Sequence, residues 1–199
     1  MRLLPALAVV LVLLAGQGDA QPRLSKADGD RFQVKLSRIV ALGNAPAGRA
    51  RAAQNTQVSD AEVNSYLRFH AQEQIPVGVT EPVLNSHADG IVTGRTVVDL
   101  DAVRKQKQRG WLDPMGYLTG RLPLTARGRL TTKNGVGRFV LESAELSGVA
   151  IPKTVLQELL SFYSRTAEDP DGINMDDPFE LPSQIREIRV AAGAATIVQ

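Results

Sequence analysis

The sequence predicts an α+β fold, in which a long, curved antiparallel sheet built from hairpins is wrapped on an apolar helix and preceded by N-terminal helices. Three observations predict it. The dipeptides Asp89-Gly90 and Asn134-Gly135 mark hairpin turns, apolar residues alternate with polar ones around the second turn, and a strongly apolar helix follows at 153–163. Runs of antiparallel strands with segregated helices are typical of α+β proteins.

The N-terminal segment predicts export. Arg2 precedes an apolar run from Leu3 to Ala15, and Gly18 and Ala20 offer the small residues that a signal peptidase reads. The run is shorter than the roughly 20 residues that a membrane-spanning helix needs. We therefore expect a signal peptide at 1–20 and a mature protein that is periplasmic or secreted. The mature chain divides into an N-terminal helix and linker at 21–58 and a single α+β, lipid-binding-like domain at 59–199.

The first half of the mature chain predicts two helices and one hairpin. Apolar residues at helical spacing between Phe32 and Val40 predict a helix at 31–42, preceded by a polar leader. Ser59 and Glu62 form a capping box, which predicts a second helix. The remaining expected elements of this half are a strand at 52–58, the second helix at 60–73, hairpin strands at 79–88 and 91–101, and a short charged helix at 101–108.

The second half predicts two more hairpins around one helix. Asn134-Gly135 as a two-residue turn places Lys133 opposite Val136, Leu130 opposite Phe139 and Arg127 opposite Glu142. Pro152 stands where a helix begins. The expected elements are strands at 121–133 and 136–147, the helix at 153–163, and a closing hairpin at 185–190 and 195–198. The second hairpin places these apolar residues on one face: Leu122, Leu124, Ala126, Leu130, Phe139 and Leu141.

This apolar face permits two interpretations. A soluble monomer rarely exposes a large contiguous apolar patch, so the face is covered either by the chain's own helices, as an ordinary closed core, or in part by an apolar guest. The helix at 153–163 is apolar over more than half its circumference, which suits either interpretation. In the second, a lipid tail occupies a groove lined by Leu124, Leu130, Phe139, Leu141, Leu156 and Leu160.

Charge is unevenly distributed along the chain. Basic residues predominate between Ala102 and Arg138, and acidic residues predominate between Phe139 and Glu187. The basic residues either pair with the acidic half or meet an anionic membrane surface. The residues expected at such a surface are Arg104, Lys105, Lys107, Arg109 and Trp111.

The residue inventory argues against catalysis. The chain has no cysteine and two histidines, and it contains neither a G-x-S-x-G elbow nor a phosphate-binding glycine loop. In the acidic loop at 168–177, glycine falls at the fourth position from Asp169 instead of the sixth, so the EF-hand pattern fails. Calcium binding by another arrangement, or metal-assisted hydrolysis, stays open for this loop. We expect no enzyme activity, no cofactor, no metal and no nucleic-acid partner.

Four stretches together resemble a known family. They are "VSDAEVNSYL", "DGIVTGRTVVDLDAV", "GVAIPKTVLQELL" and "FELPSQIREIRVAAGAATIVQ", and the resemblance covers about residues 56–199. In their order and residue pattern they resemble the LmeA-type envelope phospholipid-binding proteins, which have a TULIP-like half-tube fold. The resemblance implies a curved sheet wrapped on a helix and a non-catalytic, lipid-binding or lipid-transfer role in the periplasm.

The sequence therefore predicts an exported, non-catalytic protein that binds or transfers a lipid or another apolar ligand in a groove between curved sheet and helix. The alternative is an envelope protein–protein interaction or structural module with an ordinary closed core. In that case Trp111, Tyr117 and the basic stretch would form the contact with an envelope protein partner.

Overall fold

The computed structural model describes residues 23–45, 53–106, 119–165 and 170–199. The expected signal peptide at 1–20 lies outside this part of the chain. So do Lys107, Arg109 and Trp111 of the expected membrane-facing stretch, and Tyr117.

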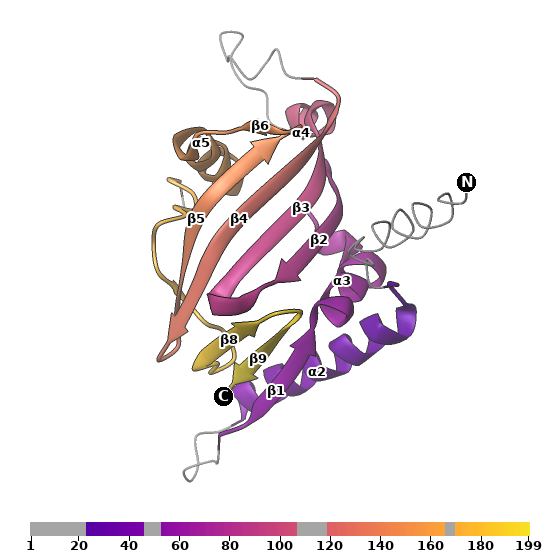
Figure 1. Ribbon diagram of the computed structural model, residues 1–199, viewed down its shortest axis with the longest axis vertical. Coiled ribbons are helices and arrows are strands. Elements are labelled where there is room, and N and C mark those ends of the chain that lie inside the picture. The colour runs from indigo at the N-terminus through magenta and orange to yellow at the C-terminus, as the bar shows by residue number, and fades with distance from the viewer. Residues whose placement is uncertain (1–22, 46–52, 107–118, 166–169) are drawn as a thin grey trace, which may run out of the picture.

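The structure confirms the α+β class and all three hairpins. One antiparallel sheet has six strands, with the order β2-β3-β4-β5-β6 and with β7 pairing to β5, and the other has three, with the order β1-β9-β8. Figure 1 shows the long, twisted strands of the larger sheet above the smaller one. The strands are β1 (Asn55–Ser59), β2 (Val79–Ser86), β3 (Ile91–Asp99), β4 (Arg121–Lys133), β5 (Val136–Leu146), β6 (Val149–Ala150), β7 (Phe179–Glu180), β8 (Glu187–Ala191) and β9 (Ala194–Val198).

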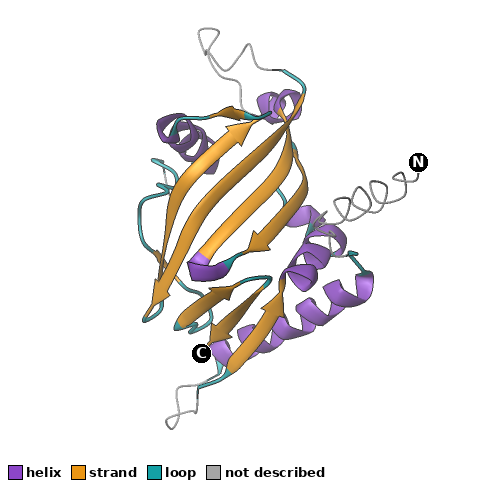
Figure 2. Cartoon of the chain, viewed as in Figure 1, coloured by secondary structure: helices purple, strands orange, loops and turns teal. Residues whose placement is uncertain are grey.

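The helices lie around the edges and ends of the sheets (Figure 2). They are α2 (Lys26–Asn44), α3 (Asp60–Phe69), α4 (Leu100–Gln106) and α5 (Lys153–Ser164), with short 3-10 turns η1 (Gln72–Gln74) and η2 (Ala88–Gly90). No helix in the described ranges combines the length and the hydropathy that crossing a bilayer requires.

Helix α2 begins earlier than its apolar periodicity predicts. Ser25 is its N-cap, and the Ser25 hydroxyl accepts a hydrogen bond from the Asp28 amide at 3.1 Å. The expectation of a polar leader up to Arg31 is therefore wrong for the residues from Lys26 onward. The first turn is polar and partly exposed. Its helical conformation is therefore stabilised by the Ser25 cap, and apolar spacing in the sequence does not reveal it.

Helix α3 confirms the capping box. The Glu62 amide donates to the Ser59 hydroxyl at 3.2 Å, and the Ser59 amide donates to the Glu62 carboxylate at 3.0 Å. The Lys35 ammonium group of α2 forms an ion pair with the same carboxylate, with Nζ 2.7 Å from Oε1. Burial alone raises the pKa of Glu62, but the hydrogen bonds from Lys35 and from the Ser59 backbone outweigh burial and hold this pKa below its ordinary value. This ion pair fixes α2 against α3.

The fully buried core lies beneath the smaller sheet. Ile39 of α2 packs with Leu181 and Ile185, and the half-buried Ile188 and Ile197 pack against them. Strand β1 joins this unit by pairing with β9, so that Val58 lies opposite Ala195. The N-terminal helix and strand are thus in contact with the C-terminal hairpin.

Three hydrogen-bonded links join the two sheets. The Thr132 hydroxyl accepts from the Ile188 amide at 2.7 Å and donates to the Ile188 carbonyl at 3.0 Å. The Gly135 amide donates to the Arg186 carbonyl at 2.9 Å. The Gly193 amide donates to the Ser86 carbonyl, also at 2.9 Å. The Asn134-Gly135 turn is therefore anchored on the smaller sheet.

Candidate functional site

The apolar face of the β4–β5 hairpin has the predicted register near its turn. Leu130 pairs with Phe139, and Gly128 pairs with Leu141. Leu124, Leu130, Phe139 and Leu141 consequently share one face of the larger sheet, because side chains alternate along each strand. The structure thus brings together the four strand residues expected to line a groove.

A β-bulge changes the register farther from the turn. Arg127 pairs with Ser143 and not with Glu142, so that expected pairing is wrong at the level of the backbone. The Arg127 guanidinium still reaches the Glu142 carboxylate at 3.2 Å. The extra residue turns Ala144 and Leu146 toward the apolar face, and it turns Ser143 and Glu145 away from it. The bulge therefore extends the apolar face along the full length of β5.

The apolar face continues across the neighbouring strands. Leu122 pairs with Val98, and Val98 pairs with Val79 of β2. Leu84 of β2 lies on this face too, since it pairs with Gly94, which in turn pairs with Ala126. An apolar surface thus spans four strands, with the polar residue Thr96 opposite Leu124 within it.

This surface is only partly covered. Its leucines and valines are half-buried: Val79, Leu84, Val92, Val98, Leu122, Leu124, Leu130, Leu141 and Leu146. Among the described apolar residues that are fully buried, the larger sheet contributes Ile91 and Ala144 alone. Ile91 pairs with Arg129 and so belongs to the opposite face. The smaller sheet, whose strands are much shorter, also contributes two fully buried apolar residues, Val58 and Val198.

Aromatic rings cover the end of the face nearest the turn. A Cβ atom at Gly128 would lie 2.8 Å from Cε2 of Phe139, and a Cβ atom at Gly137 would lie 2.6 Å from the Phe179 ring. Each ring therefore lies directly on a glycine backbone. Glycine at 128 and 137 creates the space that the rings of Phe139 and Phe179 occupy.

Helix α5 lies next to β5 and β6 (Figure 1). Leu156 and Leu160, the two helix residues expected to line the groove, are half-buried and lie one turn apart. Gln157 holds the helix to the segment before β7, since its amide donates to the Ile173 carbonyl at 3.0 Å and accepts from the Met175 amide at 2.8 Å. The six expected groove residues therefore come from two adjacent strands and the helix beside them.

Of the expected membrane-facing residues, Arg104 and Lys105 lie on α4, at the end of the larger sheet opposite the Asn134-Gly135 turn. Lys105 is exposed. Across the described ranges, no group of three or more His, Asp or Glu side chains is arranged to hold a metal ion. In the acidic loop, Asp176 forms an ion pair with Lys153 of α5.

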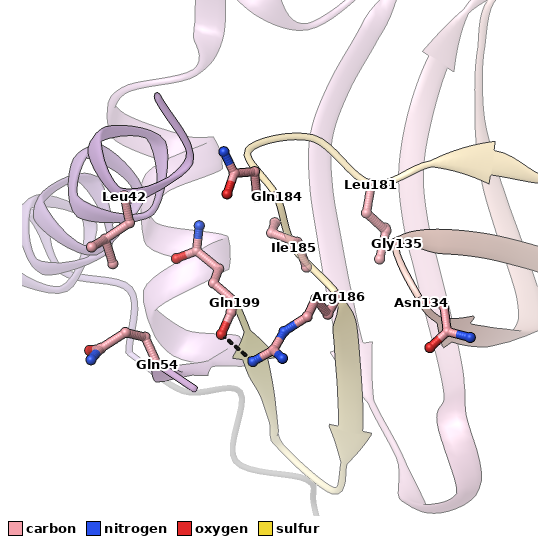
Figure 3. A pocket seen from close by; sticks show the side chains of 9 residues that line it. All are labelled: Leu42, Gln54, Asn134, Gly135, Leu181, Gln184, Ile185, Arg186 and Gln199. Carbon is pink, nitrogen blue, oxygen red and sulfur yellow. Dashed lines mark hydrogen bonds between the residues drawn. The ribbon is translucent and has the colours of Figure 1, made fainter. Parts of the chain in front are cut away.

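Two cavities lie away from the six expected groove residues. The smaller, of about 410 Å³, lies between the end of α2, the Asn134-Gly135 turn and the C-terminal residue (Figure 3). Its wall combines the apolar side chains of Leu42, Leu181 and Ile185 with polar ones. Arg186 donates to the Gln199 carbonyl at 2.6 Å, and the Gln199 amide donates to the Ile39 and Ser183 carbonyls. These bonds hold the chain segments around the cavity together.

The larger cavity, of about 1100 Å³, is a cleft between α3 and the β2 edge of the larger sheet. Sequence reasoning missed it, because α3 and β2 meet through residues far apart in the chain. Asn64 of α3 is the link: its side-chain amide donates to the Leu84 carbonyl and accepts from the Leu84 amide, both at 2.7 Å. The one available signal was an asparagine placed among the apolar positions of a helix.

Comparison of the chain with protein-family models, with curated proteins and with solved structures finds no match.

Proposed function

We propose that this chain is an exported, non-catalytic protein that binds or transfers a lipid, holding an acyl chain against the apolar face of the larger sheet. The observation that carries the proposal is the incomplete burial of that face over β2, β3, β4 and β5, with Leu124 near its middle. Contiguous apolar surface of this kind marks a ligand, membrane or partner site in soluble proteins.

Hydrocarbon is the guest that matches this surface best. The exposed edges of the face are leucine and valine side chains, which offer no hydrogen bonds, so affinity comes from removing apolar area from water. Each buried methylene contributes about 0.8 kcal/mol, and a long chain therefore offsets the cost of association. The basic residues Arg104 and Lys105 on α4 suit an anionic membrane surface from which such a chain is taken.

The direct test is mass spectrometry of a solvent extract from protein exported by a bacterial host and purified without detergent. The proposal predicts about one lipid per chain. Lipid no higher than that recovered with an unrelated exported protein would contradict it.

Matched variants test where the lipid binds. Leu124→Asn places an amide on the apolar face, whereas Thr125→Asn places the same group on the opposite face. Loss of one leucine contact is worth about 1–2 kcal/mol, so Leu124→Asn is expected to weaken uptake of a fluorescent phospholipid from vesicles about 5- to 30-fold. Thr125→Asn is expected to leave uptake unchanged. Equal uptake by both folded variants would contradict the assignment to this face.

A further inference from the structure

The cleft between α3 and β2 lies mainly on the face of the larger sheet opposite to Leu124. Val83, Arg95 and Val97 line it, and the register places all three on the side of Thr125. We propose that this cleft is a second binding site, which takes a small amphiphile with an anionic head group. The inference is independent of lipid binding on the apolar face.

The walls of the cleft supply an apolar surface from three segments of the chain. Its volume of about 1100 Å³ matches the upper range of small-molecule sites. The apolar lining residues are Leu24, Leu67, Ile75, Val79, Val83 and Val97. A hydrocarbon tail is therefore the part of the ligand that the walls accommodate.

Two arginines supply the positive charge. Asn64 is hydrogen-bonded to Leu84, and Arg68 follows one helical turn later on the same side of α3. Arg95 is the cross-strand partner of Val83, the neighbour of Leu84. Both arginines line the cleft. They therefore approach it from adjacent positions on its two walls.

Both guanidinium groups are available to an anion. Neither forms an ion pair or a side-chain hydrogen bond with another residue in the described ranges. The carboxylates in the lining are already engaged: Asp60 is buried and accepts the Ser86 amide at 2.6 Å, and Glu81 lies 4.0 Å from Arg121. The cleft therefore presents two guanidinium groups that have no carboxylate partner within the described ranges, and guanidinium groups bind carboxylate and phosphate with paired hydrogen bonds.

The edge of β2 argues for a small molecule and against an extended peptide. A peptide that adds to a sheet edge needs free backbone groups on the edge strand. At Leu84 both groups are taken by Asn64, and at Ser86 they are taken by Asp60 and the Gly193 amide. Pro82 has no amide hydrogen to offer. Strand addition is thus blocked along this part of the cleft.

Titration calorimetry with decyl phosphate, kept below its micelle-forming concentration, tests the proposal on the exported chain. We expect saturable binding that weakens at least about tenfold in the double variant Arg68→Gln, Arg95→Gln, since charge-assisted contacts are lost. Decanoate is expected to follow decyl phosphate. Inorganic phosphate is expected to bind far more weakly, because it lacks the tail; equal binding of inorganic phosphate would overturn the amphiphile assignment.

Two controls separate this cleft from the apolar face. Arg189→Gln removes an exposed arginine on β8 and is expected to bind decyl phosphate as the unmodified chain does. Leu124→Asn leaves the cleft residues in place and is expected to keep the part of decyl phosphate binding that depends on Arg68 and Arg95. Absence of saturable binding, or equal binding by the double variant once thermal unfolding shows it folded, would overturn the proposal. Loss of binding in Leu124→Asn alone would assign the amphiphile to the apolar face and overturn it as well.

Discussion

The ring of Phe139 lies over the backbone of Gly128, its diagonal neighbour across the β4–β5 pair. This contact places the largest side chain of the apolar face where any residue other than glycine would put its Cβ atom. It also explains a glycine in the middle of a long strand, where glycine otherwise weakens pairing.

Gly128→Ala is expected to destabilise the protein by about 1–3 kcal/mol, because the new methyl group would lie 2.7 Å from the Val140 carbonyl oxygen and force the Phe139 ring to move. Gly94→Ala is the matched control. Position 94 shares the same face, and a Cβ atom there meets nothing within 4 Å. Urea unfolding should find the control neutral or slightly more stable. Equal destabilisation by both changes would show that ring packing is not the cause.

Glu62→Gln is expected to lower the free energy of unfolding by on the order of 1–2 kcal/mol at pH 7. The substitution keeps the capping geometry but removes the charge that Lys35 contacts. The Lys35 side chain is 33% exposed, so solvent screening limits the cost. The pKa of Glu62 is lowered in the folded protein. The carboxylate therefore contributes full stability above its unfolded pKa of about 4.3, and it loses that contribution as pH falls through the folded pKa.

Unfolding measured between pH 7 and pH 3 checks this linkage. The stability difference between the unmodified chain and Glu62→Gln should shrink as the solution becomes more acidic, since a protonated glutamate resembles glutamine. Glu187→Gln removes an exposed partner of Arg189 and should have little effect at any pH. A Glu62→Gln difference that stays constant down to pH 3 would contradict the assigned ion pair.

Thr132→Val is expected to lower the free energy of unfolding by about 1–3 kcal/mol, because it removes the hydroxyl that forms hydrogen bonds with both backbone groups of Ile188. Amide hydrogen exchange at Ile188 should become faster, since the link between the two sheets is lost. Thr131→Val is the control, as this exposed hydroxyl contacts only the Arg138 carbonyl, at 3.5 Å. Unchanged exchange at Ile188 in Thr132→Val would rule out the link.

Local chemistry made the hairpins and helices predictable. Asp89 and Asn134 both adopt positive φ, as their turn dipeptides require, and the Ser59 capping box begins α3 where the sequence places it. The bulge in β5 is also indicated by the sequence. After Leu141 the apolar alternation shifts by one residue to Ala144 and Leu146, and only a bulge keeps these on the same face.

Contacts between distant segments were not predictable in the same way. The pairing of β1 with β9 depends on which of several short strands meets which edge, and no local pattern decides that. The cleft at α3 exists because Asn64 reaches Leu84, a contact that joins two elements across the fold. Arg68 and Arg95 both line this cleft for the same reason, since no pattern in the sequence joins them.

The central claim is that an acyl chain lies on the apolar face around Leu124. Photo-crosslinking with a phospholipid that carries a diazirine in its acyl chain tests this most directly, with the attached peptides identified by mass spectrometry. The account predicts that labelled peptides come from 122–146, and that Leu124→Asn reduces their labelling while Thr125→Asn does not. Labelling confined to segments outside the apolar face, such as 60–75 beside the cleft, would contradict it.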